Sequence, residues 1–226
     1  MPLKRYLSSI PGAKTVARKL NRILLCVGFP GSAKYWDEVY ASGGNSGEGS
    51  YGRLADFKAE ILNQFVTNES IASVIEFGCG DGNQLSLASY PMYMGVDVSP
   101  SAISRCKSRF KSDASKRFVA LDEYNCERAQ LAVSLDVVYH LVEDSVYESY
   151  MKRLFDAATH FVAIYSTNYN GKDIDDKPHV LHRRFSDWVS NHRTDFVLIQ
   201  NIKNRFPSSD AAENGSPCEF YFYKRL

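Results

Sequence analysis

Long apolar runs are missing from this chain of 226 residues. The longest run near the start, residues 23–29, is far shorter than the roughly 20 residues that a membrane-spanning helix needs. No small-residue cleavage site follows this run, so the sequence does not predict a secretory signal. We therefore expect a cytoplasmic protein without membrane spans.

Cysteine is scarce and scattered, because the chain holds five of them, an odd number, and no Cys-x-x-Cys pair. Disulfide frameworks and structural zinc sites are built from paired cysteines, so the sequence predicts neither. The histidines match no recognised metal-ligand spacing either, and no metal is expected. Unpaired thiols suit a reducing cytoplasm.

A strong charge of one sign is also lacking, since the formal net charge is +1 at pH 7. Residues 1–40 hold seven basic side chains against two acidic ones, and the remainder is slightly acidic. The main part therefore has no basic field of the kind that nucleic-acid binders use, and it has no Asn-Pro-Pro-Tyr motif for a flipped base. Nucleic acid is not an expected partner.

Residues 1–34 are predicted to form a basic amphipathic extension. Between Pro11 and Pro30, apolar side chains recur at helical spacing, and the basic ones lie largely elsewhere on the same helix. Such a helix can contact an anionic membrane surface, here through residues 12–29, which would place the protein peripherally at the inner membrane. Packing of the helix on the domain or on a partner is the other interpretation.

Residues 35–226 alternate between strand and helix patterns. Strands are predicted over 73–77, 92–98, 118–121, 130–135, 161–165, 196–202 and 219–223, and helices over 54–66, 101–110, 146–155 and 185–191. This alternation predicts an α/β fold, a Rossmann-like doubly wound sheet of seven mostly parallel strands. The last two strands leave no room for a helix between them, so we expect an antiparallel pairing at one edge.

The strongest local signal is Glu76-Phe77-Gly78-Cys79-Gly80-Asp81-Gly82, where a strand turns directly into a predicted short helix. Glycine allows a sharp turn and lets a ligand approach the main chain. Asp97 stands at the tip of the next strand, where nucleotide-binding folds place the partner of the ribose hydroxyls.

Two kinds of cofactor compete for this turn. Dinucleotides prefer Gly-x-Gly-x-x-Gly, whereas the spacing here is Gly-x-Gly-x-Gly, with the carboxylates of Glu76 and Asp81 beside it. Acidic side chains repel a pyrophosphate and suit a cationic sulfonium. The pattern therefore predicts S-adenosylmethionine, with a dehydrogenase as the less favoured alternative.

The same segments resemble class I S-adenosylmethionine-dependent methyltransferases. Residues 76–82 resemble their first motif, residues 95–99 their second-strand motif, and residues 131–141 their fourth-strand region. Residues 35–36, 43–47, 49–53, 57–60 and 134–144 are similar to methyltransferases encoded with bacterial surface-polysaccharide biosynthesis.

The resemblance implies a set of cofactor-binding residues in this chain. The backbone of Gly78, Cys79 and Gly80 is expected to hold the methionine end, and Glu76 to orient the turn. Asp97 is expected to accept hydrogen bonds from both ribose hydroxyls, because one carboxylate has two acceptor oxygens.

Five further residues complete the predicted cofactor site. Val98 and Leu135 are expected to border the cofactor. Asp122 is either the acceptor for the adenine amino group or a solvated turn residue. Arg53 pairs with the cofactor carboxylate or is simply exposed, and Tyr35, beside Trp36, forms part of a lid or simply packs.

His140 is the candidate general base for an alcohol acceptor, since it follows the fourth strand and can titrate near neutral pH. Asp136 could hold or charge-balance it. The competing interpretation is a structural histidine bonded to a backbone carbonyl. Much of the rate of methyl transfer can come from positioning alone.

A second polar cluster, His179, His182, Arg183 and Arg184, lies between the fifth and sixth predicted strands. Two adjacent arginines suit an acidic acceptor such as a carboxylate, a phosphate or a nucleotide-linked sugar. A solvated basic turn is the other interpretation.

The leading hypothesis is O-methylation of a sugar or another small molecule in surface-glycan biosynthesis, so the expected partner is a small-molecule or glycan acceptor. Methylation of a phosphate or phosphonate oxygen is the second enzymatic alternative, and it would depend on Arg183 and Arg184 more than on His140. A non-catalytic cofactor-binding or scaffold protein is the third. Protein methylation and the oligomeric state stay open.

Overall fold

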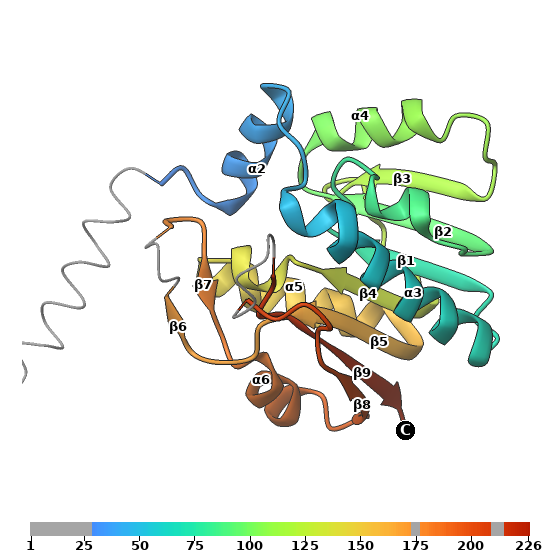
Figure 1. The fold of residues 1–226 in the computed structure, drawn as a ribbon, viewed down its shortest axis with the longest axis vertical. Coiled ribbons are helices and arrows are strands. Elements are labelled where there is room, and N and C mark those ends of the chain that lie inside the picture. Colours follow the sequence, from blue (N-terminus) through green and yellow to red (C-terminus); the bar gives the residue numbers. More distant parts are fainter. Residues whose placement is uncertain (1–28, 173–176, 209–214) are drawn as a thin grey trace, which may run out of the picture.

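The computed structural model describes residues 29–172, 177–208 and 215–226. Its centre is one seven-stranded sheet with strand order β3-β2-β1-β4-β5-β9-β8, and helices cover both faces (Figure 1). The strands are β1 (Ser73–Phe77), β2 (Met92–Asp97), β3 (Lys116–Ala120), β4 (Ala129–Leu135), β5 (Ala158–Ser166), β8 (Phe196–Ile202) and β9 (Glu219–Arg225). The predicted doubly wound sheet is thereby confirmed.

Strand direction also follows the expectation. Strands β1 to β5 run parallel, whereas β9 pairs antiparallel with both β5 and β8. The four residues from Val74 to Phe77 in β1 are all buried, because helices cover both sides of the central parallel strands. The sheet order reverses between β1 and β4, and ligands bind at such a switch point in open α/β sheets.

The helices form two layers. Helices α3 (Gly52–Asn68) and α4 (Pro100–Arg109) pack on one face of the sheet, and α5 (Asp144–Ala157) and α6 (Phe185–His192) on the other. Helix α4 begins as expected, because Ser99 accepts a hydrogen bond from the Ala102 N–H at 3.1 Å and Pro100 follows it. Short 3₁₀ turns are η3 (Glu48–Ser50), η4 (Gln84–Leu87) and η5 (Val138–His140).

Three local features differ from the sequence expectation. The helix predicted after the glycine turn is only the 3₁₀ turn η4, because the stretch before β2 is short and ends in Pro91. An unpredicted helix, α2 (Ser32–Ala41), crosses the expected boundary between residues 34 and 35. A small hairpin of β6 (Gly171–Lys172) and β7 (Leu181–His182) was not predicted either.

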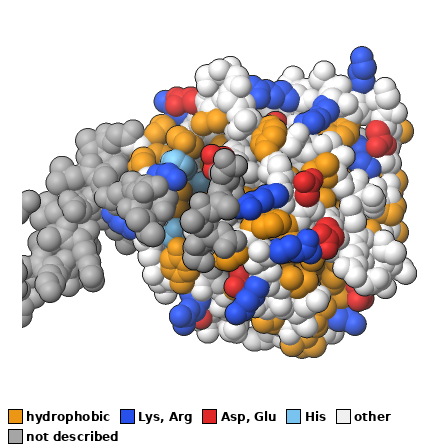
Figure 2. Space-filling model, in the orientation of Figure 1, with side chains coloured by type: hydrophobic (Ala, Val, Ile, Leu, Met, Phe, Trp, Pro, Cys, Tyr) orange, Lys and Arg blue, Asp and Glu red, His pale blue; other side chains and the backbone are white. Residues whose placement is uncertain are grey.

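The predicted amphipathic helix between Pro11 and Pro30, with its membrane contact through residues 12–29, falls almost wholly outside the described residues. Within the three described ranges, no helix has both the length and the apolar character needed to cross a bilayer. On the face viewed in Figure 2, basic and acidic side chains are interspersed, and histidines lie among hydrophobic side chains.

Candidate functional site

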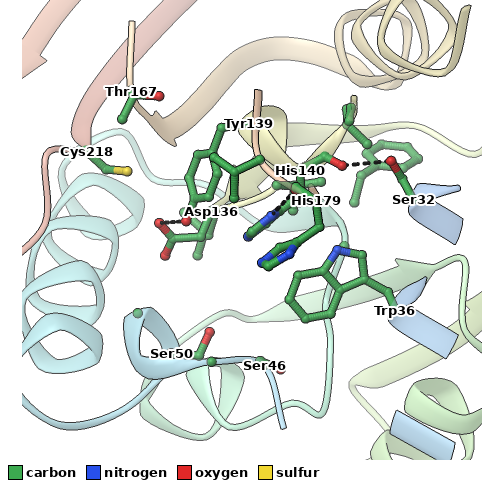
Figure 3. A pocket seen from close by; sticks show the side chains of 18 of the residues that line it. Ser32, Trp36, Ser46, Ser50, Asp136, Tyr139, His140, Thr167, His179 and Cys218 are labelled. Carbon is green, nitrogen blue, oxygen red and sulfur yellow. Dashed lines mark hydrogen bonds between the residues drawn. The ribbon is translucent and has the colours of Figure 1, made fainter. Parts of the chain in front are cut away.

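A cavity of about 700 Å³ lies at the carboxyl ends of β1, β2 and β4, beside the switch point of the sheet. Its wall runs from the glycine turn after β1 and Asp97 at the end of β2 to Asp136 and His140, which follow β4 on the other side of β1, and to His179; Figure 3 labels the last three. Residues of helix α2 and of the loop around η3 also line it. The space is therefore continuous between the predicted cofactor residues and the predicted catalytic ones.

The glycine turn has the strained backbone that its sequence implies. Gly78 and Gly80 have positive φ angles of 82° and 56°, and a side chain at either position would collide with Val137 or Ser46, respectively. The N–H groups of Gly78 and Cys79 donate to the Val96 carbonyl. These N–H groups are therefore already hydrogen-bonded within the protein. A ligand in the cavity would contact the other atoms of Gly78 and Cys79 that line it.

Asp97 is 6% exposed and fixes the turn to the second strand. Its Oδ2 accepts from the Gly80 N–H and its Oδ1 from the Ser99 N–H, both at 2.9 Å. Burial raises the pKa of Asp97, and the backbone hydrogen bonds partly offset this. Each carboxylate oxygen can accept another hydrogen bond, so Asp97 can still bind a pair of hydroxyl groups in the cavity.

Glu76 is a second buried carboxyl at the same end of the cavity. Its Oε2 accepts a hydrogen bond from the Tyr93 hydroxyl at 2.7 Å. Burial raises the pKa of Glu76 to about 7, and the Asp97 charge adds to this rise. A cationic ligand would favour the ionised form of both acids.

The raised pKa of Glu76 predicts a pH-dependent gain in stability for Glu76→Gln. Since Glu76 ionises near 4.5 when unfolded and near 7 when folded, its burial destabilises the fold progressively as pH rises from 4.5 to 7. Glutamine removes that penalty and can still accept from Tyr93. We expect the free energy of unfolding at pH 8 to rise by at most about 3 kcal/mol, shrinking below about 1 kcal/mol at pH 5.

Denaturant unfolding of the ligand-free protein at both pH values measures this effect. An equal change at pH 8 and pH 5 would contradict the assignment, because only a titrating carboxyl gives the difference.

Asp81 has a different role from the one that its sequence position indicated. Its carboxylate accepts from the Ser46 N–H at 3.0 Å, the Tyr51 hydroxyl at 2.8 Å and the Asn83 N–H at 3.0 Å. It therefore ties the Gly/Ser-rich loop to the glycine turn and is not among the residues that line the cavity.

His140 lies at the opposite end, in η5 just after β4. Its Nδ1 is 3.0 Å from the carbonyl oxygen of His179, and since a carbonyl only accepts, Nδ1 carries the proton of the neutral ring. The Nε2 atom is then a hydrogen-bond acceptor. Burial lowers the pKa of His140 to about 4, so the imidazole is neutral at pH 7.

Asp136 faces the same end but does not hold His140 through a hydrogen bond. Its carboxylate accepts from Lys58 Nζ at 2.6 Å and from the Tyr139 hydroxyl at 3.1 Å. Its effect on His140 is that of a nearby charge, which raises the histidine pKa against the larger effect of burial. Sequence reasoning missed Lys58, although a lysine in the inward stripe of a helix was a visible signal.

Helix α2 contributes to the wall of the cavity. Ser32 begins it, donating its N–H to Glu143 Oε1 at 2.7 Å and its hydroxyl to the His140 carbonyl at 2.8 Å. Trp36 lines the cavity, with its ring 4.8 Å from that of His140. Tyr35 is not part of the lining and stacks on His179 from outside, with the ring centroids 4.5 Å apart.

Six predicted site residues lie outside the cavity lining: Gly80, Tyr35, Arg53, Asp122, Arg183 and Arg184. The Arg53 guanidinium lies 4.6 Å from the Phe206 ring, and Asp122 is exposed beyond Leu121, which does line the cavity. Arg183 pairs with Asp144 at 2.8 Å and donates to the Val142 carbonyl at 3.0 Å.

Arg184 is exposed where α6 begins. Neither arginine lines the cavity: Arg183 is bound by Asp144 of α5 and by the loop before it, and Arg184 is exposed. The two histidines of that cluster differ from the arginines in their position. His179 and His182 both line the cavity, and His182 Nδ1 lies 2.8 Å from Thr167 Oγ1.

The remaining predicted residues line the cavity. Val98 and Leu135 contribute apolar wall at the ends of β2 and β4. In the described part of the chain, no group of three or more His, Cys, Asp or Glu side chains could hold a metal ion.

Comparison with known proteins finds solved structures that are similar to this chain. No protein-family model matches the chain, and no curated protein matches it. The methyltransferase domain of bacterial CtHen1-C is 20% identical, with a TM-score of 0.59 over 76% of this chain and 99% of that one.

Two further similar structures carry the cofactor or its product. The N-methyltransferase NodS from Bradyrhizobium japonicum WM9, in complex with S-adenosylhomocysteine, is 14% identical, with a TM-score of 0.64 over 86% of this chain and 98% of that one. Magnesium protoporphyrin IX methyltransferase (ChlM) from Synechocystis PCC 6803, with bound S-adenosylmethionine, is 11% identical, with a TM-score of 0.62 over 88% and 99%. The fold is thus the Rossmann-like fold of these methyltransferases.

Proposed function

We propose that this protein is a methyltransferase that uses S-adenosylmethionine. The observation that carries the proposal is the single cavity that joins Asp97 and the glycine turn to His140 and Asp136 at the switch point of the sheet. Similar structures that bind S-adenosylmethionine or S-adenosylhomocysteine support it.

The residues of the cavity fit this cofactor better than a dinucleotide. Glu76 and Asp97 make one end acidic, which suits a ligand that carries positive charge. The glycine turn leads only into the 3₁₀ turn η4, so it lacks the long helix whose N-terminus would stabilise a pyrophosphate.

Each end of the cofactor then has its own partners in the chain. Asp97 would hold the ribose hydroxyls, Gly78, Cys79 and Glu76 the methionine end, and apolar Val98 and Leu135 would border it. When bound, S-adenosylmethionine supplies an electrophilic methyl group.

We propose O-methylation of a sugar or another small molecule in surface-glycan biosynthesis as the reaction. A hydroxyl acceptor must lose its proton, and neutral His140 can take that proton on Nε2 because Nδ1–H is bound to the His179 carbonyl. Trp36, His179 and His182 surround the same end and can orient the acceptor. The pKa of about 4 makes His140 a weak base, so positioning carries a large share of the rate.

The alternatives have less support from the geometry. A phosphate or phosphonate acceptor needs cationic partners, but Arg183 and Arg184 are outside the cavity and Lys58 is paired with Asp136. The formal net charge of +1 at pH 7 favours a small acceptor over a nucleic-acid strand. The polar lining around His140 favours catalysis over cofactor binding alone.

A transfer assay tests this proposal. Purified protein with methyl-labelled S-adenosylmethionine is offered neutral sugars, sugar nucleotides, sugar phosphates and phosphonates, and products are identified by mass spectrometry. We expect a methyl ether on a sugar hydroxyl. Methylation of a phosphate or phosphonate oxygen would contradict the proposed acceptor atom.

A further inference from the structure

Lys58 is a charged residue in the interior of the protein. It lies on the inward face of α3 with Leu54 and Leu62, one turn away on either side, and its side chain is 0% exposed. Its Nζ is 2.6 Å from Asp136 Oδ2 and 5.3 Å from the centre of the Tyr165 ring. Burying an ammonium group is costly unless a carboxylate pairs with it, so Lys58 depends on Asp136.

Asp136, the partner of this lysine, has an unusual backbone conformation. Its φ angle is 58°, in the left-handed region that few residues other than glycine adopt. Its second oxygen accepts from the Tyr139 hydroxyl at 3.1 Å. Gly49 of the loop around η3 packs so closely that a side chain there would approach Asp136 Oδ2 to 2.8 Å.

The two side chains of this pair differ in their position relative to the cavity. Asp136 lines the cavity near His140 (Figure 3), whereas the fully buried Lys58 is not part of the lining. A ligand at this end therefore meets hydrogen-bond acceptors, namely the Asp136 carboxylate and the His140 imidazole, backed by a cation that it does not touch.

We propose that Lys58 is a positioning residue that holds the Asp136 carboxylate at the acceptor end of the cavity. The pair thereby makes this end select an acceptor that donates hydrogen bonds, a hydroxyl or an amine, over an anion. This inference rests on the proposed methyltransferase function. It assigns Lys58 no contact with either reactant.

Two ligands separate this role from a merely structural one. S-adenosylhomocysteine has no group where the methyl of S-adenosylmethionine stands, and sinefungin has an amino group there, which is protonated at neutral pH. The ratio of their dissociation constants therefore reports the electrostatic potential next to the acceptor. It is measured by calorimetry for the wild type, Lys58→Met, Lys58→Arg, Asp136→Asn and the double variant Lys58→Met/Asp136→Asn.

The two single substitutions should move this ratio in opposite directions. In Lys58→Met the carboxylate loses its cation, so the preference for sinefungin should rise on the order of tenfold. In Asp136→Asn the lysine loses its anion, so the preference should fall by a similar factor; asparagine tolerates the left-handed backbone.

The other variants are matched controls. The double variant and Lys58→Arg should stay near the wild-type ratio, because each keeps the pair neutral overall. Lys34→Met removes an exposed lysine whose partner Glu38 is also exposed, and it should change nothing. The double variant should also melt at a higher temperature than Lys58→Met, since it leaves no buried charge unpaired.

Ratios that stay unchanged in both single variants, with both ligands still bound, would overturn this inference and leave the methyltransferase proposal standing. Should Lys58→Met fail to fold, the fall expected for Asp136→Asn and the unchanged ratio expected for the double variant still decide. Failure of the wild type to bind either ligand would overturn the function and this inference together.

Discussion

Asp97→Asn is expected to weaken the binding of S-adenosylhomocysteine by about 100-fold or more. Both carboxylate oxygens of Asp97 hold backbone N–H groups, at Gly80 and Ser99, while the side chain still faces the cavity. Hydrogen bonds to a charged acceptor contribute about 1.5–3 kcal/mol each, and the ribose has two hydroxyls to donate. The asparagine amide would in addition place N–H against one of the backbone donors.

Asp113→Asn is the matched control for this substitution. Asp113 also accepts from the N–H two residues ahead, that of Ser115, at 3.0 Å, but it is exposed and is not part of the cavity lining. Calorimetric titration of both variants should show weakened binding only for Asp97→Asn. Equal affinity of Asp97→Asn and the wild type would remove Asp97 from the ribose site.

The second large effect is expected for His140→Gln, which should lower turnover on a hydroxyl acceptor by about 100-fold to 10,000-fold. Glutamine can still donate to the His179 carbonyl, but it offers no basic nitrogen to the acceptor. S-adenosylhomocysteine affinity should stay near that of the wild type, because Asp97 ends β2 and His140 follows β4, two strands that lie on opposite sides of β1. Turnover and affinity are measured on the same preparation.

His192→Gln provides the comparison. His192 also places Nδ1 near a backbone carbonyl, that of Trp188 at 2.9 Å, and its ring stacks on an aromatic one, but it lies outside the cavity lining. Its turnover should match the wild type. Full activity in His140→Gln would mean that the acceptor needs no base.

The pH dependence of His140 follows from its lowered pKa. Because the ring ionises near 4 when folded and near 6.5 when unfolded, its contribution to stability is present above pH 6.5 and is lost as pH falls toward 4. Turnover should accordingly show no loss from protonation of His140 between pH 6 and 8. This window is opposite in sign to that of Glu76, whose burial destabilises the fold as pH rises from 4.5 to 7.

Local patterns in the sequence predicted most of the fold. Strand β1 has the predicted bounds, and the Ser99–Pro100 start of α4 is confirmed. Both predictions succeed because burial periodicity and helix capping depend on residues that are close together in the sequence. The glycine turn, Asp97 and His140 were placed at the carboxyl ends of their strands by the same reasoning. That placement brings them to one cavity.

Pairings between distant residues could not be predicted. Lys58 meets Asp136 across 78 positions of sequence, and no local pattern specifies that contact. Arg183 looked like an anion-binding residue, but Asp144 at the start of α5 pairs with it. Helix α2 was missed because its inward face is mostly aromatic and polar, with Ser32 and Tyr40 buried, and so lacks an aliphatic stripe.

The central claim is that the cavity binds S-adenosylmethionine, and calorimetric titration of the wild-type protein tests it most directly. S-adenosylmethionine, S-adenosylhomocysteine and, as a control, NADH are titrated separately into the same preparation. We expect the first two to bind in the micromolar range, about −8 kcal/mol, and NADH not to bind. Binding of NADH, or of none of the three, would contradict the proposed function.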